Sequence, residues 1–111
     1  MFNQKFYILV IHLILSVIGL KKKIIDIEAH ALFRMLERGS EFGLNYYETK
    51  DRAFKTARLG KLAKRKHLSG KNKTYYRYFN DNLSFYVVCQ EKEFEDYIKC
   101  LIRTVIIEEG R

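Results

Sequence analysis

Several residue types and motifs that define common protein classes are scarce or absent in this 111-residue chain. Proline and tryptophan are missing, and no internal repeat or low-complexity tract occurs. The two cysteines, Cys89 and Cys100, have neither the number nor the spacing of a zinc site or a disulfide framework. The chain also lacks a Walker-type glycine loop, a dinucleotide fingerprint, a His-Glu-x-x-His sequence and a Cys-x-x-Cys sequence. We therefore expect no metal ion and no nucleotide cofactor.

The remaining composition suits one domain of modest size. Hydrophobic residues make up 48% of the chain and aromatic residues 14%, which suffices for a single hydrophobic core. The net charge of +8 and the isoelectric point near 9.5 favour a polyanionic partner. That partner is either a nucleic acid or an anionic membrane surface, and the charge alone does not choose between them.

The longest apolar stretch is FYILVIHLILSVIGL, from Phe6 to Leu20. As a helix it would measure about 22 Å, which is shorter than the roughly 30 Å hydrocarbon core of a bilayer. Three interpretations stay open: a membrane anchor or uncleaved signal-like segment, a cleaved signal peptide, or a part of the fold. If the segment is an anchor, the lysines Lys21 to Lys23 favour a cytoplasmic location for the rest. We therefore divide the chain into an apolar segment, residues 1–23, and one domain, residues 24–111, which is cytoplasmic and either free or membrane-associated through residues 6–20.

Two helices are expected at the start of the domain. Asp26 suits an N-cap and Gly39 suits the left-handed position that ends a helix, which predicts a helix over residues 27–38. A weaker helical repeat over residues 44–57 predicts the second helix. Its apolar positions are Leu44, Tyr47, Phe54 and Ala57.

The segment from Arg52 to Lys73 carries nine lysine or arginine residues and no acidic residue. It is either a solvated helix end and loop or an arm that contacts phosphates. If the arm contacts about four phosphates, the logarithm of affinity should fall with a slope of about −3 to −4 against the logarithm of salt concentration. The residues that we expect to bind nucleic acid are Arg58, Lys61, Lys64, Arg65, Lys66, Lys71 and Lys73.

The C-terminal third predicts β-structure. KTYYRYF and LSFYVVCQ are rich in aromatic and β-branched residues, and Asn80 to Asn82 form a turn signal between them. A third strand follows in YIKCLIRTVII. Alternation places one set of its residues on a single face: Ile98, Cys100, Ile102, Thr104 and Ile106. We therefore predict an α+β fold in which two N-terminal helices pack on one side of an antiparallel sheet of three to four strands.

The register of the last hairpin bears on the two cysteines. A turn centred near Glu93 places Cys89 opposite Tyr97 and away from Cys100. We therefore expect both cysteines to be buried free thiols.

The stretch HALFRMLERG places His30, Arg34 and Arg38 four residues apart, so they form one stripe on a helix. Apolar residues occupy the other arc, as in a helix that packs on a core. The stripe is either the ordinary solvated side of that helix or a site that acts on a phosphodiester. The second interpretation uses the proton exchange of histidine near neutral pH and the two donors that arginine offers a phosphate.

The same stretch has the pattern His-x3-Arg-x2-Glu-Arg-Gly. Together with the second helix, the Lys/Arg-containing hairpin and the threonine of RTVI, it resembles a family of small toxin-like proteins with a RelE-like fold, grouped with the barnase–EndoU–colicin–RelE class of endoribonucleases. The resemblance covers Ile24 to Ile107. It implies a toxin–antitoxin role with an acidic antitoxin-like protein as partner. It also implies four site residues, His30, Arg34 and Arg38 on the helix and Thr104 on the last strand.

The chemistry that the resemblance implies is metal-independent cleavage of RNA by attack of the ribose 2′-hydroxyl on the adjacent phosphate. Such a reaction needs a base, an acid and cations. We assign proton transfer to His30 and phosphate binding to the two arginines of the stripe, with Arg77 in the first hairpin strand as a further cation. Tyr76 and Tyr78 either pack against the helices, which we favour, or stack RNA bases.

Two other functions would use the same features. One is a non-enzymatic module whose basic surface binds nucleic acid or an acidic protein. The other is a membrane-tethered domain whose basic segments contact anionic lipid.

Overall fold

The described part of the chain contains two helices and five strands. The structure, a computed structural model, describes residues 21–64 and 72–111. Its elements in chain order are β1 (Lys22–Ile27), α2 (Ala29–Glu41), α3 (Tyr46–Leu59), β2 (Lys61–Ala63), β3 (Lys73–Tyr78), β4 (Leu83–Glu93) and β5 (Tyr97–Glu109). The apolar run from Phe6 to Leu20 lies outside the described residues, and the anchor, signal and core interpretations remain predictions. The expected boundary between residues 23 and 24 falls inside β1.

The described strands form one mixed sheet of five strands in the order β1-β5-β4-β3-β2. β1 runs parallel to β5, and all other neighbours are antiparallel. The predicted α+β fold is confirmed, but the antiparallel sheet of three to four strands is wrong, and a strand precedes the helices. A parallel pair needs a long crossover connection, which here includes both helices and three strands. A local sequence pattern carries no sign of such a distant pairing.

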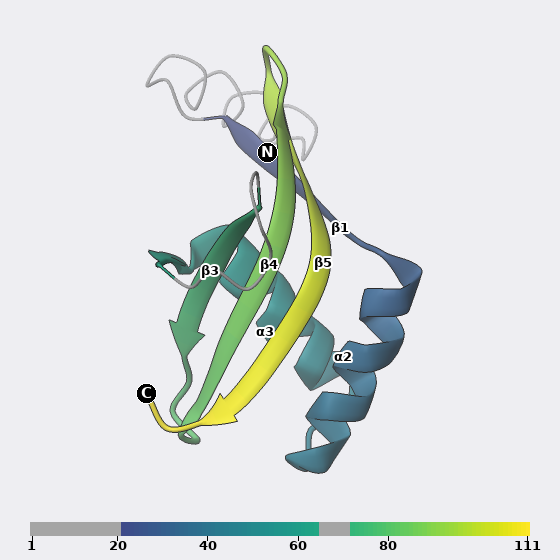
Figure 1. The fold of residues 1–111 in the computed structure, drawn as a ribbon, viewed down its shortest axis with the longest axis vertical. Coiled ribbons are helices and arrows are strands. Elements are labelled where there is room, and N and C mark those ends of the chain that lie inside the picture. The colour runs from purple at the N-terminus through teal and green to yellow at the C-terminus, as the bar shows by residue number, and fades with distance from the viewer. Residues whose placement is uncertain (1–20, 65–71) are drawn as a thin grey trace, which may run out of the picture.

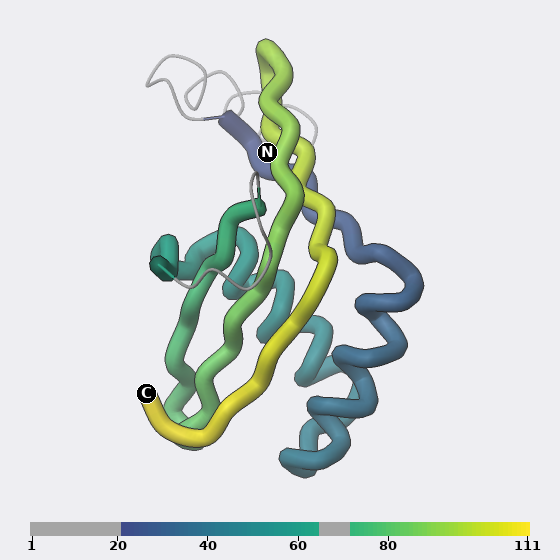
Figure 2. Tube along the Cα trace, viewed as in Figure 1, coloured from purple at the N-terminus to yellow at the C-terminus, as the bar shows by residue number. Residues whose placement is uncertain are grey.

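The helices lie differently on this sheet. α3 packs on one face, against β3 and β4, whereas α2 packs against β5 and α3 (Figure 1). The core between them contains Met35 of α2, Ala53 of α3, and Phe85 and Val87 of β4, all of which are fully buried. The β4–β5 hairpin extends past both helices (Figure 2). Neither helix of the described chain has the length and apolar character needed to cross a membrane.

α2 begins later than its sequence predicts. The backbone N–H of Glu28 donates to the carbonyl of Ile102 (3.1 Å), so contact with β5 continues to this residue and the helix starts at Ala29. Asp26, the expected N-cap, lies in β1. The N-cap is Glu28, whose side chain makes no capping hydrogen bond. Pairing with the sheet therefore decides where this helix starts.

α2 also ends later than predicted. Gly39 was expected to take a left-handed conformation, but it is a buried helical residue. A Cβ at this position would clash with the side chain of Thr49, so glycine allows α2 and α3 to approach closely. The left-handed conformation occurs at Gly43, with φ of 77°.

α3 confirms the second predicted helix, with both ends shifted by two residues. Asn45 and Glu48 form a capping box: the Asn45 side chain accepts from the Glu48 N–H (2.8 Å), and the Glu48 carboxylate accepts from the Asn45 N–H (3.2 Å). This reciprocal pair satisfies two backbone donors that helix geometry leaves open and sets the start at Tyr46.

The first hairpin agrees with its turn signal. β3 and β4 pair antiparallel on either side of Asn80 to Asn82, and Asn82 takes φ of 66°. The second turn lies further along the chain than predicted, because β4 continues to Glu93. The acidic end of β4 is held by lysines: Glu91 lies 3.0 Å from Lys23, and Glu93 lies 2.9 Å from Lys21.

The later turn changes the register of the second hairpin. Cys89 pairs with Ile102, not with Tyr97 as predicted. Both cysteines are buried and free, as expected. The pairing also skips Arg103, since Val88 pairs with Thr104 and the register shifts there.

This bulge overturns the predicted single face of β5. An extra residue in one strand reverses the alternation beyond it. Cys100 and Ile102 therefore share the core with Val105 and Ile107, whereas Thr104 points to the other face of the sheet.

Candidate functional site

The face of the sheet opposite α3 carries a group of tyrosines. No helix of the described residues covers it, and it is called here the helix-free face. Phe85 and Val87 of β4 point into the core, so Tyr86 between them points the other way. Tyr86 pairs with Tyr76 of β3, and their ring centroids are 5.0 Å apart. Tyr78 lies two residues further along the same face, and all three tyrosines are half-buried.

The placement of these rings differs from the favoured sequence interpretation. Tyr76 and Tyr78 were expected to pack against the helices, but the pairing register directs them to the helix-free face. Their neighbour Tyr75 takes the core position and is 9% exposed. Strand alternation sets this division, and the sequence could not reveal which set faced the helices.

Basic side chains accompany the tyrosines on the helix-free face. Lys61 of β2 pairs with Tyr76 and is exposed, as are Lys99 and Arg103 of β5. Arg103 forms an ion pair with Glu28 (2.9 Å) and donates to Gln90 of β4 (3.1 Å). Acids are present as well, because Asp26 and Glu108 alternate onto the same face.

The Arg38 end of the His30–Arg34–Arg38 stripe contacts the edge of β5. β1 pairs with β5 only as far as Ile102, and α2 then takes its place beside the strand. The Arg38 guanidinium donates to the carbonyl of Val105 on this edge. At 3.6 residues per turn, Arg34 is rotated about 40° and His30 about 80° away from Arg38 around the helix. Both of these side chains are exposed.

Two further predicted site residues lie in different places. Thr104 precedes Val105 in β5 and is half-buried on the helix-free face, so it lies close to the Arg38 end of the stripe. Arg77 pairs with Phe85, which directs it to the opposite face from Thr104. Its guanidinium lies 5.6 Å from the ring centroid of Phe79. Arg77 is also distant from the stripe, because β4 lies between β3 and β5, the strand that Arg38 contacts.

The predicted nucleic-acid-binding residues are partly described. Arg58, Lys61 and Lys64 are exposed at or beyond the end of α3. Lys73 is also exposed but forms an ion pair with Glu91 (3.2 Å). Arg65, Lys66 and Lys71 lie outside the described residues.

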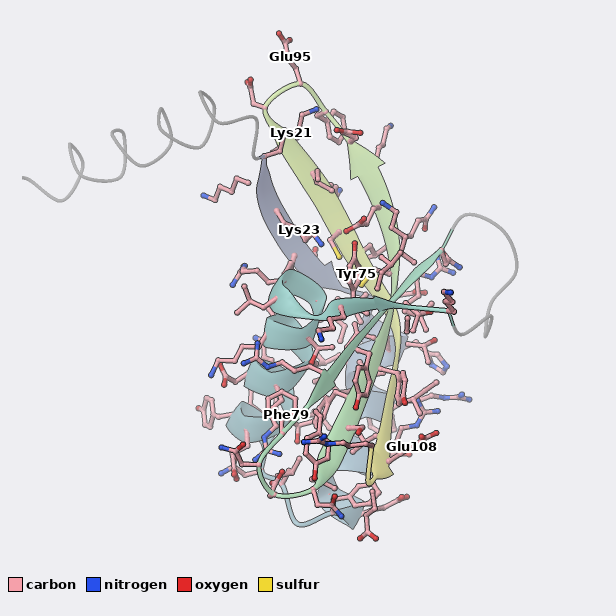
Figure 3. All side chains as sticks on the ribbon, turned by 90° about the vertical axis from the view of Figure 1, so that its left-hand side faces the viewer. Lys21, Lys23, Tyr75, Phe79, Glu95 and Glu108 are labelled. Atoms are coloured by element: carbon pink, nitrogen blue, oxygen red, sulfur yellow. The ribbon has the colours of Figure 1, made fainter. Side chains whose placement is uncertain are left out.

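A buried charge cluster around Glu91 was missed at the sequence level. Its carboxylate accepts from the Tyr75 hydroxyl (2.9 Å) and lies 3.0 Å from the Lys23 ammonium, with Lys73 as a third partner. Lys23 also lies 4.1 Å from the Tyr75 ring centroid, and both are labelled in Figure 3. Burial opposes ionisation of Glu91, but the hydrogen bonds from Lys23, Tyr75 and Lys73 hold its pKa below the ordinary value of 4.5. Glu91 and its partners lie on three strands, β4, β1 and β3, so no local pattern signals the cluster.

The two thiols lie beside this cluster. A hydrogen bond with Cys100, together with burial, raises the pKa of the Cys89 thiol. Both cysteine side chains are fully buried, so the pair is part of the packed interior.

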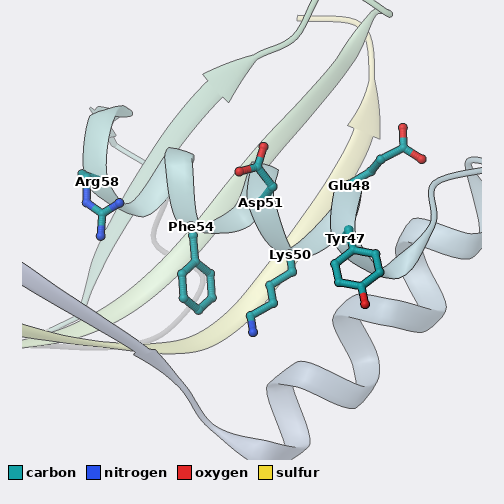
Figure 4. A pocket seen from close by; sticks show the side chains of 6 residues that line it. All are labelled: Tyr47, Glu48, Lys50, Asp51, Phe54 and Arg58. Atoms are coloured by element: carbon teal, nitrogen blue, oxygen red, sulfur yellow. The ribbon is translucent and has the colours of Figure 1, made fainter.

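Two hollows of the described surface are relevant to ligand binding. The first, of about 650 Å³, lies on α3, where Tyr47, Lys50 and Phe54 point to the side facing α2 and β1 (Figure 4). Its lining includes both acidic and basic side chains, namely Glu48, Asp51, Lys50 and Arg58. The second, of about 530 Å³, lies at the outer edge of β3. No group of three or more His, Cys, Asp or Glu residues in the described segments is placed to hold a metal ion.

Comparison of the chain with protein-family models, with curated proteins and with solved structures finds no match.

Proposed function

We propose that this protein binds single-stranded RNA on the helix-free face of its sheet. The observation that carries the proposal is the group of half-buried tyrosines on that face, flanked by exposed lysines. An unpaired base stacks on an aromatic ring whatever its sequence, and basic side chains attract the phosphates beside it. The net charge of +8 supports the same partner.

Cleavage of the bound RNA is the second candidate activity. It is favoured by the stripe of His30, Arg34 and Arg38 on α2, whose Arg38 end lies next to Thr104 at the border of the helix-free face. Arg34 would hold the scissile phosphate, and His30 would exchange the proton of the 2′-hydroxyl or of the leaving oxygen. The RelE-like resemblance supports this chemistry, with an acidic antitoxin-like protein as the regulator.

Binding is tested with the full chain and a fluorescent single-stranded RNA by anisotropy. A double variant, Tyr76→Leu with Tyr86→Leu, should weaken binding by about tenfold or more, because it removes two stacking rings. Tyr47→Leu is the matched control, because Tyr47 lies on α3 and is 78% exposed. Equal RNA affinity in the double variant and the control, with unchanged circular dichroism spectra, would contradict the proposal.

Cleavage is tested on the same RNA in EDTA. Degradation by the wild-type chain that disappears in the His30→Ala, Arg34→Ala double variant supports the nuclease. Intact RNA with retained binding leaves a non-enzymatic RNA-binding module. If RNA is neither bound nor cleaved, the membrane-tethered alternative is tested by fractionation of a chain that lacks residues 1–20. The deletion must stop before Lys21, because Lys21 pairs with Glu93 of β4.

A further inference from the structure

The hollow at the outer edge of β3 is defined by the shortness of β2. β2 pairs with β3 only from Thr74 to Tyr76, so no strand of the described residues pairs with the last part of β3 on that side. The chain passes close to β3 at Gly60, where a Cβ would clash with the carbonyl oxygens of Thr56 and Tyr76. The hollow between this crossing and the β3–β4 turn has a volume of about 530 Å³.

Among the described residues that line this hollow, three have a cationic side chain and none has a carboxylate side chain. The lining consists of Leu59, Gly60, Lys61, Tyr76, Arg77, Tyr78, Asn80 and Arg111. Within residues 21–64 and 72–111, none of the three cations forms an ion pair. The acid of the adjacent turn, Asp81, is already neutralised by Arg52 at 2.8 Å.

The aromatic residues of the lining add a second type of contact. Tyr78 donates its hydroxyl hydrogen to the Asn82 side chain (2.6 Å), which fixes the ring at the rim of the hollow. The Arg111 guanidinium lies 4.7 Å from the centroid of that ring. A guanidinium held against an aromatic ring keeps its in-plane donors available to a phosphate.

We propose that this hollow binds the phosphate of a nucleotide. Arg77 and Arg111 bind the phosphate oxygens, Lys61 supplies a third positive charge, and the face of a tyrosine ring contacts the base or sugar. The volume suits a single nucleotide, because small-molecule sites are hollows of about 300–1,000 Å³. This assigns Arg77 to a separate site and not to the α2 stripe, because β4 lies between β3 and β5, the strand that Arg38 contacts.

The bound phosphate belongs either to the terminal nucleotide of an RNA chain or to a free nucleotide. The site does not depend on stacking by the Tyr76–Tyr86 pair. Failure of RNA binding on the helix-free face would therefore leave a free nucleotide as the ligand.

The test uses the full chain and isothermal titration with uridine 5′-monophosphate, uridine and inorganic phosphate. The monophosphate should bind, uridine should not, and inorganic phosphate should compete. Arg77→Gln and Arg111→Gln should each weaken monophosphate binding by about tenfold or more, because each removes a charge-assisted contact. Lys55→Gln is the control of equal charge change, since Lys55 is exposed on α3 and pairs with Asp51.

Three results would overturn the proposal. They are no binding of the monophosphate, equal binding of uridine, or full affinity in both arginine variants. An oligonucleotide with and without a 5′-phosphate then identifies the source. A gain of about tenfold from the 5′-phosphate that is lost in Arg77→Gln assigns the site to an RNA terminus. Equal oligonucleotide affinities, with retained monophosphate binding, assign it to a free nucleotide.

Discussion

Single residues in this protein have roles that depend on what lies across from them. Arg38 was predicted as a phosphate clamp, yet its guanidinium already binds the Val105 carbonyl at the edge of β5. Gly39 was predicted as a helix terminator, yet it allows the helices to approach. For both residues the local pattern indicated a specific role, but the observed role depends on a contact with another element, β5 for Arg38 and α3 for Gly39.

Replacement of Gly39 by alanine should destabilise the fold. The new Cβ would overlap the side chain of Thr49, and overpacking of this kind costs about 1–3 kcal/mol. Urea unfolding measures the loss, with the exposed Ser40→Ala on the same helix as control. Thr49→Ala in the same chain should recover part of the loss, because it removes the two closest atoms. Simple additivity of the two substitutions would contradict this account.

At the scale of the element, the two helices are specified in different ways. α3 carries its own start signal in Asn45 and Glu48, so its position follows from the sequence to within two residues. α2 lacks a side-chain cap, and its start is set by the hydrogen bond from Glu28 to Ile102 of β5. The strands differ in a similar way. Alternation alone sets which residues of β3 face the core, whereas in β5 the bulge at Arg103 reverses the alternation.

The capping box gives a prediction at this scale. Asn45→Ala should lower the free energy of unfolding by about 1 kcal/mol, because the Glu48 N–H loses its acceptor. Glu48→Gln is the control, since glutamine can still accept from the Asn45 backbone. Thermal unfolding followed by circular dichroism measures both variants. A larger loss in Glu48→Gln than in Asn45→Ala would show that charge, not capping, stabilises this end of α3.

At the scale of the whole molecule, Glu91 joins elements that are far apart in the chain. Its partners come from β1 and β3, and Lys23 also donates to the Ala57 carbonyl in α3 (3.1 Å). The side chain of Glu91 is only 7% exposed. Removal of its charge would leave Lys23, whose side chain is 17% exposed, without its carboxylate partner, and such a loss is costly away from water. Lys73 is 53% exposed, so water can replace its contact with Glu91.

Glu91→Gln should therefore destabilise the protein in a pH-dependent way. The folded state lowers the pKa of Glu91 below 4.5, so its contribution is present above pH 4.5 and is lost as the pH falls through the folded-state value. At pH 7 the variant should lose on the order of 2–3 kcal/mol. Urea unfolding from pH 7 to pH 3 should show this difference shrinking. A difference that is constant over this range would contradict an electrostatic role.

The sequence by itself determined the α+β class, the presence of both helices and the first hairpin turn, because turn residues and periodicity act over a few neighbours. Only the tertiary structure decided the parallel pairing of β1 with β5, the reversal of faces at Arg103 and the direction of Tyr76. It also separated Arg77 from the helix stripe that the sequence had grouped with it. The physical reason is that β1 pairs with a strand more than seventy positions away in the chain. Because side chains alternate along a strand, the register of the pairing then sets which face each residue of the strand occupies.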